Sequence, residues 1–540
     1  MLSILLASSV FAAPAVAPIH DHAAEVGQRF GHDLLWRAYL RFFEPEALAP
    51  DDLPPPLCAT ALVEALKQEW DSFDAEERAR ISRHVAPFLP DLRAEMPQVH
   101  SVAAPVNGMA PPPSQVCWGS YLPNSIQGAH FSVEWESGTL SQSEAESLLD
   151  ELELSYAVQI DQLGWRAPEG SEQFLMPFYV VDGFSASAYT TVNFCDGRYL
   201  PYVVAYSGSF FGGTWWMDMQ THEFNHASQW GYGSAIEFWW WEATATYMQE
   251  YVYPSHNEWA PYITGYADQP WVAMNASDQQ DYDIFWHMYG MAIWNFWIDE
   301  NFGGLDTILA MWDYSQGQGG YYNLDQQEML TAAGQDFPTV YKGFTAANTV
   351  MTYDEQSWFG SVRLVDDVSD LPADGAPSTT ERPEAFGQNY LRFNLPAPDP
   401  DKDAFEFTFT GAEPANWLVQ IVGTGTSEIK TIVEIPVEGS TGVGRLENYG
   451  DYGQVFVVVS PRKDDPGTYD YTWSARAVEG EPDAPPAEDT GVGGGDGTGT
   501  GGQPELVGST AGCGCATDGA GALAGWTAVA GALLALRRRR

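Results

Sequence analysis

Two histidines four residues apart, with a glutamate directly after the first, constrain the fold of this chain more than any other feature. They lie in the run Thr221-His222-Glu223-Phe224-Asn225-His226. Residues four apart share one face of an α-helix, so the run predicts a helix that presents both imidazoles to one ion. Glu223 would stand aside, close enough to contact a water on that ion without being a ligand. Imidazole ligands suit Zn²⁺, which keeps one coordination position open in catalytic sites.

A third ligand is predicted in a second helix-like run. The apolar run from Phe238 to Met248 contains a single acidic residue, Glu242. A buried carboxylate is costly unless it is paired or bound to a metal, so Glu242 is the candidate third ligand. Glu237 is the rival candidate. The alternative to a metal site is a pair of helices with a purely structural role.

Together these two runs resemble the gluzincin metallopeptidases, whose third zinc ligand is a Glu on the helix after the His-Glu-x-x-His helix. The resemblance covers the catalytic core only. It implies that His222, His226 and Glu242 bind zinc and that Glu223 is the general base. The chain departs from the family in the short spacing between His226 and Glu242, and in Thr246, where the family often has a second acidic residue.

The resemblance also implies a group that stabilises the oxyanion of the tetrahedral intermediate, on a helix after the third ligand. The run Trp286-His287-Met288-Tyr289-Gly290 opens an apolar stretch in the matching place. Tyr289 is the candidate and His287 the alternative. A packed core residue is the structural interpretation of either side chain.

The charge of the chain excludes one class of partner. Its 24 basic and 73 acidic residues give a formal net charge of −49. A phosphate backbone needs a basic face, so we expect no nucleic-acid binding. A protein or peptide substrate is the expected partner.

Segments at the amino end predict export and a covering region. Residues 1–17 read as a signal peptide, with an apolar run and a cleavage-like Val10-Phe11-Ala12, although no basic residue precedes that run. A buried N-terminal helix is the alternative. Residues 18–115 show helical periodicity, and they would form either a propeptide that covers the site or an accessory region.

The cysteines leave the disulfide open. Export makes a bond among Cys58, Cys117 and Cys195 plausible, but three residues allow three pairings, each leaving one thiol over. None of the cysteines has metal-ligand spacing with the histidines.

Residues 116–365 are predicted to be the zinc metallopeptidase domain. Strands are expected at 131–135, 174–181 and 199–206, and a capping box at Ser141 and Glu144 opens a helix. By the resemblance, 199–206 would be an edge strand that pairs with an extended peptide. An ordinary sheet edge is the alternative.

The carboxyl-terminal half predicts a second fold unit and a sorting signal. Residues 366–383 read as a boundary, and 384–478 contain six short β-like runs typical of a β-sandwich. Residues 479–512 read as a Gly-rich linker. Residues 513–540, with Cys513-Gly514-Cys515, an apolar run and four terminal arginines, resemble the MYXO-CTERM sorting signal of myxobacteria. The resemblance implies a membrane-inserted tail that a sorting protease processes, and attachment at the cell surface; a simple tail anchor is the alternative.

The sequence therefore predicts an α+β protein: a gluzincin-like metallopeptidase domain with a helical N-terminal region and a C-terminal β-sandwich. The expected function is that of a secreted, surface-sorted zinc endopeptidase. One alternative is a non-catalytic surface or adhesion protein that keeps the zinc fold as a scaffold. Another is hydrolysis of a non-peptide amide.

Overall fold

The computed structural model describes the central part of the chain. The described residues are 32–44, 58–85, 115–183, 188–210, 213–232, 237–276, 282–316, 326–399, 401–412, 416–462 and 467–480. The predicted signal peptide and sorting tail, and all but the first two residues of the predicted linker, lie outside them. Within the described residues no helix has the length and apolar character needed to span a bilayer. The described fold is α+β, with three five-stranded sheets.

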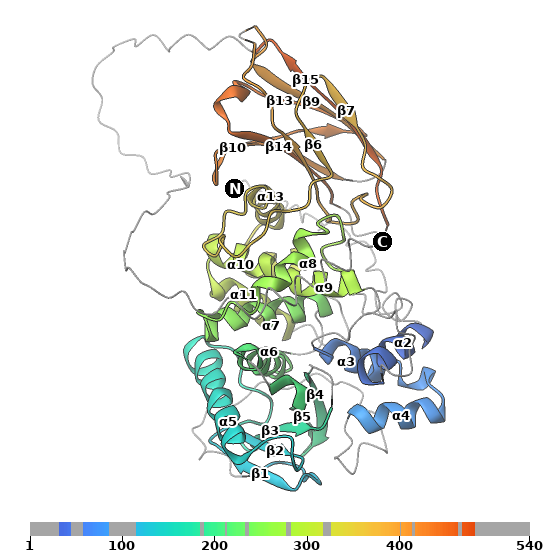
Figure 1. The fold of residues 1–540 in the computed structure, drawn as a ribbon, viewed down its shortest axis with the longest axis vertical. Helices are drawn as coiled ribbons and strands as arrows, with labels where there is room; N and C mark the ends of the chain where they lie inside the picture. The colour runs from blue at the N-terminus through green and yellow to red at the C-terminus, as the bar shows by residue number, and fades with distance from the viewer. Residues whose placement is uncertain are drawn as a thin grey trace, which may run out of the picture. The chain divides into compact units, whose positions relative to one another are not determined.

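A mixed five-stranded sheet supports the predicted site (Figure 1). Its strand order is β1-β2-β3-β5-β4. The inner pairs β2–β3 and β3–β5 are parallel, and the outer pairs β1–β2 and β4–β5 are antiparallel. The strands are β1 (Asn124–Gln127), β2 (Phe131–Trp135), β3 (Met176–Val181), β4 (Ala188–Cys195) and β5 (Arg198–Tyr206).

The edge strands of this sheet are β1 and β4, so the prediction of an edge strand at residues 199–206 is wrong. That segment is β5, which lies between β3 and β4. Pro201 is tolerated there because the ladder with β3 begins only at Val203, and Pro201 faces β4 alone. Proline lacks the N–H that a second ladder would need. The edge strand beside β5 is β4, and Cys58 forms an isolated bridge with its first residue, Ala188.

Helices bury both faces of the sheet. One face packs against α5 (Gln142–Tyr156), which begins at the predicted capping box, and against α6 (Trp215–Gln229). The other face packs against α2 (His32–Phe43), α3 (Thr60–Gln68) and α4 (Ala75–Val85) of the N-terminal region. All six residues of β3 are buried as a result.

A layer of aromatic-rich helices follows the sheet in sequence. Its core includes Trp240 and Trp312, whose rings stack with centroids 4.8 Å apart. The expected apolar helix after Trp286 forms as two helices, α9 and α10. The layer consists of α7 (Phe238–Val252), α8 (Ile263–Ala267), α9 (Tyr282–Gly290), α10 (Ala292–Asn301), α11 (Leu305–Gln316), α12 (Gln326–Ala332) and α13 (Phe337–Ala347).

Two facing sheets form a sandwich at the carboxyl end of the described chain, with orders β11-β10-β14-β8-β6 and β12-β13-β9-β15-β7. The predicted boundary at 366–383 contributes two of its strands, so the sandwich begins earlier than expected. The first sheet has β6 (Asp366–Val368), β8 (Asn389–Phe393), β10 (Trp417–Thr424), β11 (Ile429–Glu434) and β14 (Gln454–Pro461). The second has β7 (Ala373–Gly375), β9 (Ala404–Gly411), β12 (Val437–Glu438), β13 (Thr441–Leu446) and β15 (Tyr471–Val478).

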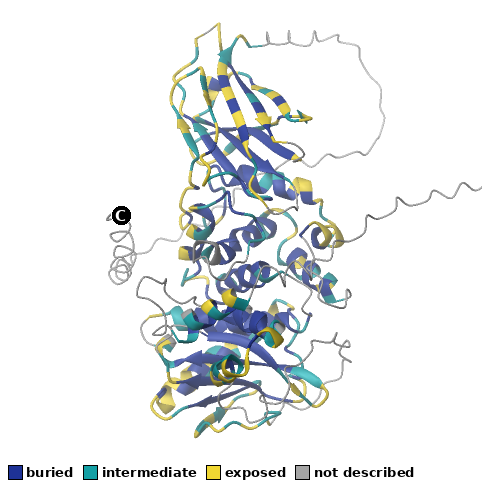
Figure 2. Cartoon of the chain, turned by 90° about the vertical axis from the view of Figure 1, so that its right-hand side faces the viewer, coloured by how far each residue is buried: buried dark blue, intermediate teal, exposed yellow. Residues whose placement is uncertain are grey.

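The sandwich and the helical layer share one core. Buried and exposed residues alternate along the first six residues of β15, whereas every residue of β10 is buried. Figure 2 shows both kinds of strand in the sandwich, one banded by exposed residues and one buried throughout. The reason is that β10 contacts the second sheet on one face and α13 on the other. A buried hydrogen-bond network crosses the same boundary: the Tyr266 hydroxyl donates to Gln388 Oε1 at 2.7 Å and accepts from Asn348 Nδ2 at 2.7 Å.

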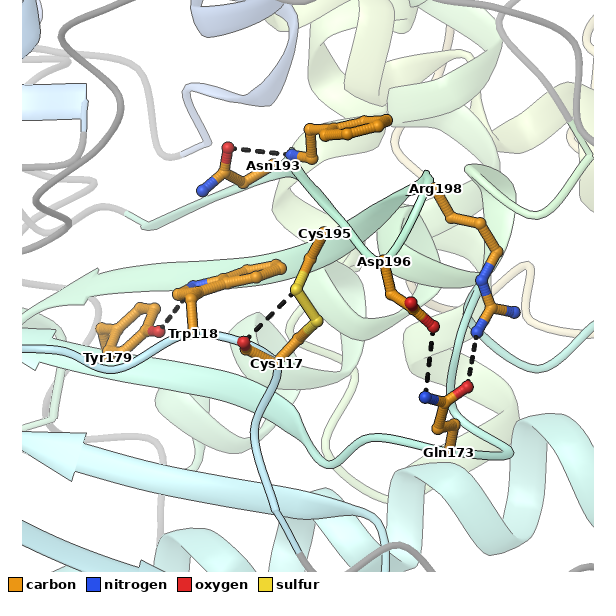
Figure 3. The surroundings of a disulfide bond; sticks show 9 residues. Cys117, Trp118, Gln173, Tyr179, Asn193, Cys195, Asp196 and Arg198 are labelled. Atoms are coloured by element: carbon orange, nitrogen blue, oxygen red, sulfur yellow. Dashed lines mark hydrogen bonds between the residues drawn. A yellow bond between two sulfur atoms is a disulfide. The ribbon is translucent and has the colours of Figure 1, made fainter.

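A disulfide joins Cys117 to Cys195 and leaves Cys58 as the free thiol of the described chain (Figure 3). Of the three pairings that the sequence allowed, this one closes a separation of 78 residues. It ties the segment before β1 to the last residue of β4, where Trp118 also donates to Tyr179. The edge strand is thereby fixed at its carboxyl end.

Candidate metal centre

The two predicted histidine ligands face each other on α6. Their Nε2 atoms lie 3.0 Å apart, with the rings at right angles. Every residue of α6 from Asp218 to Gln229 is buried, because the helix is enclosed by β4, β5, α5 and α7. The helical spacing of the sequence thus places both imidazoles at one buried point.

Glu242 on α7 completes the predicted set. Its Oε2 lies 3.1 Å from Nε2 of His222 and 3.4 Å from Nε2 of His226, and its Oε1 has no hydrogen-bond partner. The rival Glu237 lies just before α7, where its carboxylate accepts from Trp239 and Asn275 instead. Glu242, and not Glu237, is brought to the histidines.

A fourth residue, Cys58, joins the cluster, and sequence reasoning missed it. Its Sγ lies 3.6 Å from Nε2 of His226. One ligand atom from each of Cys58, His222, His226 and Glu242 lies within 4.8 Å of the other three, and all four residues are buried. Cys58 precedes α3 in the N-terminal region, far from the histidines in sequence. The signal that could have found it was the one cysteine left over by the disulfide.

The cluster has the size and charge that a divalent cation requires. Four nitrogen, oxygen and sulfur ligands held tetrahedrally at zinc distances lie about 3.3–3.6 Å from one another. The observed separations of 3.0, 3.1, 3.4 and 3.6 Å are close to those edges. Among the described residues that line the adjoining cavity there is a further carboxylate, Glu223, and no positively charged Lys or Arg. This buried Cys-His-His-Glu group can therefore hold a metal ion.

Neutral amides orient the two imidazoles. Nδ1 of His226 lies 2.7 Å from Oε1 of Gln229, which can only accept, so this nitrogen carries the proton and Nε2 offers its lone pair to the cluster. Gln229 is held by Asn225 Oδ1 and the Trp241 carbonyl. Gln249 lies 3.5 Å from Nδ1 of His222. Amides thus occupy the role that a second acidic residue has in the gluzincins.

Glu223 lines the same cavity without belonging to the ligand set. Its Oε2 accepts hydrogen bonds from Thr190 Oγ1 at 2.7 Å and Thr60 Oγ1 at 3.2 Å, and its Oε1 has no hydrogen-bond partner. Thr190 lies on the edge strand β4 and Thr60 begins α3. A carboxylate beside the cluster with one unengaged oxygen is positioned to accept a proton.

Tyr289 lies at the cluster and His287 does not. The ring of Tyr289 stacks on His222 with centroids 5.9 Å apart, and its hydroxyl donates to the carbonyl of Cys58 at 3.4 Å. His287 is turned toward Tyr266, with ring centroids 6.0 Å apart, and is absent from the cavity lining. Of the two oxyanion candidates, only Tyr289 is within reach of the site.

The protonation of the cluster follows from burial and from its partners. Burial by itself raises the pKa of Glu242, but the His226 charge and hydrogen bonds from both imidazoles outweigh it and lower that pKa to about 2. Burial by itself lowers the pKa of His226, but the negative charge of Glu242 outweighs burial, so the pKa of His226 is raised overall. Burial raises the pKa of Tyr289 well above its usual value, so its hydroxyl remains a donor. The centre combines an ionised acid, imidazoles and a neutral phenol.

The cavity at the centre is small. It has room for about one water molecule. Cys58 closes one side, and aromatic and apolar side chains form much of the rest; its lining is Cys58, Trp215, Met219, His222, Glu223, Gln249, Tyr262 and Tyr289. In this form of the chain the cavity does not admit a peptide.

Comparisons with known proteins assign no activity. No family model and no curated protein matches the chain. Among solved structures, it matches the pre-peptidase C-terminal domain of a collagenase from Bacillus anthracis. The match has 9% sequence identity and a TM-score of 0.16, and covers 22% of this chain and 100% of that one. A likeness of this size carries no argument, so the function rests on the geometry of the centre.

Proposed function

We propose that the protein is a zinc-dependent endopeptidase that is exported and sorted to the cell surface. The observation that carries the proposal is the convergence of His222, His226 and Glu242 on one point, with Glu223 beside them and outside the ligand set. Two nitrogens and a carboxylate suit zinc. A scaffold without catalysis has no need of a buried acid left unligated beside the metal position.

Each side chain has a role in the proposed reaction. A zinc ion in the centre would supply Lewis-acid chemistry, activating a water and polarising a carbonyl. Glu223 takes the proton of the attacking water and passes it to the leaving amine. Tyr289 donates a hydrogen bond to the oxyanion that forms on the substrate carbonyl. His222, His226 and Glu242 fix the position of the metal, and Gln229 fixes the tautomer of His226.

A peptide is favoured over another amide because an edge strand of the sheet lies beside the centre. The edge strand β4 carries Thr190, whose side chain contacts the proposed base. On the outer side of this strand the carbonyl of Ala188 accepts a hydrogen bond from the N–H of Ala59, and the N–H of Thr190 donates one to Thr60 Oγ1. An extended peptide can use the same backbone groups, as in β-strand addition.

Export is supported by the disulfide and rests otherwise on the sequence. The Cys117–Cys195 bond is typical of proteins that fold in oxidising compartments. The predicted signal peptide and the tail that resembles a sorting signal lie outside the described residues. The proposed partners are thus a protein or peptide substrate, the membrane through the tail, and the protease that processes that tail.

The test combines metal analysis with hydrolysis of an unstructured protein such as casein. Because Cys58 lies in the same cluster, hydrolysis is measured in a Cys58→Ala background. Glu223→Gln is expected to keep zinc and to lose about 10²- to 10⁴-fold in kcat, the usual contribution of a general base. Glu237→Gln, the same change at an acid outside the cluster, is the matched control. Undiminished hydrolysis in Glu223→Gln would refute the assigned base, and a parent chain without zinc would refute the centre.

A further inference from the structure

We propose that Cys58, Ala59 and Thr60 form a built-in inhibitor, in which the Cys58 thiolate is the fourth metal ligand and the backbone occupies the substrate position on β4. The inference rests on the proposed peptidase function and adds its regulation. It predicts that the full chain is latent until these three residues withdraw.

The first observation is the metal position. A catalytic zinc site has three protein ligands and an open fourth position, whereas a structural site is closed by four. Here Cys58 Sγ lies 3.6 Å from His226 Nε2 and within 4.8 Å of the ligand atoms of His222 and Glu242. The N–H of Thr60 points to the same sulfur at 3.4 Å. The sulfur therefore fills the position that catalysis needs open.

The second observation is that the same segment holds the two proposed catalytic side chains. Thr60 Oγ1 donates to Glu223 Oε2, and the Cys58 carbonyl accepts from the Tyr289 hydroxyl. The base and the oxyanion donor are thus both engaged by residues two positions apart in the chain. A structural thiol ligand alone would not require either contact.

The third observation is the strand edge. Cys58 forms a parallel bridge with Ala188, the first residue of β4, and the N–H of Ala59 donates to the Ala188 carbonyl at 2.9 Å. The N–H of Thr190 donates to Thr60 Oγ1 at 2.8 Å. These are the backbone groups that an extended substrate would use, so the segment and a substrate exclude each other.

A folded scaffold holds the segment in register. The helix α3, which begins at Thr60, lies along β4 through a buried pair of Glu64 and Lys67. The hydroxyl of Thr191 donates to Glu64, and Lys67 donates to the Val192 carbonyl at 3.2 Å. The helices α2, α3 and α4 also cover an apolar face of the sheet. Opening the site therefore needs a local withdrawal of residues 58–60. A bound metal would then take a water in place of Sγ, and the released thiolate would take a proton from the solvent.

Cobalt substitution tests the ligand without any activity measurement. A thiolate bound to Co²⁺ gives a charge-transfer absorption in the near ultraviolet. We expect this band in the full chain and in Glu223→Gln, and its loss in Cys58→Ala. A control chain in which Cys513 and Cys515, outside the described residues, are changed to Ser is expected to keep the band. A full chain that binds Co²⁺ without the band would overturn the proposal.

Hydrolysis of casein tests the inhibition. A closed form favoured by a few kcal/mol leaves the open form about 0.1–10% populated, so Cys58→Ala is expected to be about 10- to 1,000-fold more active than the full chain. The double variant Cys58→Ala, Glu223→Gln checks that the activity comes from this site. Equal activity in the full chain and Cys58→Ala would overturn the inhibitory role and leave the peptidase assignment standing. If no variant hydrolyses casein while the band behaves as expected, the peptidase assignment and the inhibitory role fail, and Cys58 stands as the fourth ligand.

Discussion

Thr190 is the residue through which the edge strand is expected to control the proposed base. Its hydroxyl lies 2.7 Å from Glu223 Oε2 and 2.8 Å from the Glu223 carbonyl, and its single hydrogen can serve one acceptor at a time. A carboxylate is the stronger acceptor. In the open form Thr60 is withdrawn, so Thr190 becomes the donor that keeps this carboxylate in place. We therefore predict that Thr190→Val misplaces the base without disturbing the metal.

The size of the effect follows from the bond that is lost. A hydrogen bond to a charged group contributes about 1.5–3 kcal/mol. At 1.36 kcal/mol per tenfold in rate, its loss lowers kcat by about 10- to 160-fold. Zinc content is expected to stay at the parent value, because Thr190 contacts none of the four ligand side chains at hydrogen-bond distance.

The assay is steady-state peptide hydrolysis in the Cys58→Ala background, with zinc measured on the same samples. Thr191→Val is the matched control, because it is the same substitution at the neighbouring residue of the same strand. Its hydroxyl donates to Glu64 at 2.6 Å and not to the base. If Thr191→Val loses as much activity as Thr190→Val, or if Thr190→Val loses none, the positioning role is refuted.

Two further predictions concern stability. Burial, reinforced by nearby acids, raises the pKa of Glu300 to about 8 from 4.5. Between these pH values the folded chain holds a proton that the unfolded chain releases, so the free energy of unfolding should fall as pH rises from 4.5 to 8. The fall is at most about 1.4 kcal/mol per pH unit, and less because solvent screens this partly exposed group. The unfolding free energy, measured by urea titration at several pH values, should fall less steeply with pH in Glu300→Gln than in the parent chain. An unchanged pH dependence would contradict this. Tyr266→Phe removes the hydroxyl that bonds to Asn348 Nδ2 and Gln388 Oε1, and each buried group left without this partner should lower the free energy of unfolding by about 1–3 kcal/mol. Tyr121→Phe, at a 72% exposed position, is the control and should leave that free energy unchanged. Equal unfolding free energies for the two variants would contradict the prediction.

The part of the site that the sequence predicted is the part encoded by local spacing. His222 and His226 share a helix face whatever the rest of the chain does. The single acid in an apolar run marked Glu242 because burial of an unpaired charge is costly. The capping box at Ser141 is likewise a local signal, and α5 begins there.

The part that could not be predicted depends on contacts distant in sequence. Cys58 reaches the histidines through the packing of α3 on β4, and no local period records that packing. The run at residues 199–206 predicted a strand correctly but not its neighbours, so an edge position was assigned to β5, which lies between β3 and β4. The short strands β6 and β7 carry too few residues for a pattern, and they were interpreted as a boundary.

The common core of the helical layer and the sandwich sets an order on biosynthesis. Tyr341 in α13 bonds to Ser460 in β14, and Tyr266 bonds to Gln388 just before β8. A ribosome makes the amino-terminal half first, so the Tyr266–Gln388 bond needs the chain through residue 388 and the Tyr341–Ser460 bond needs the chain through residue 460. The core that the helical layer shares with the sandwich is therefore complete only after residue 460 has been made.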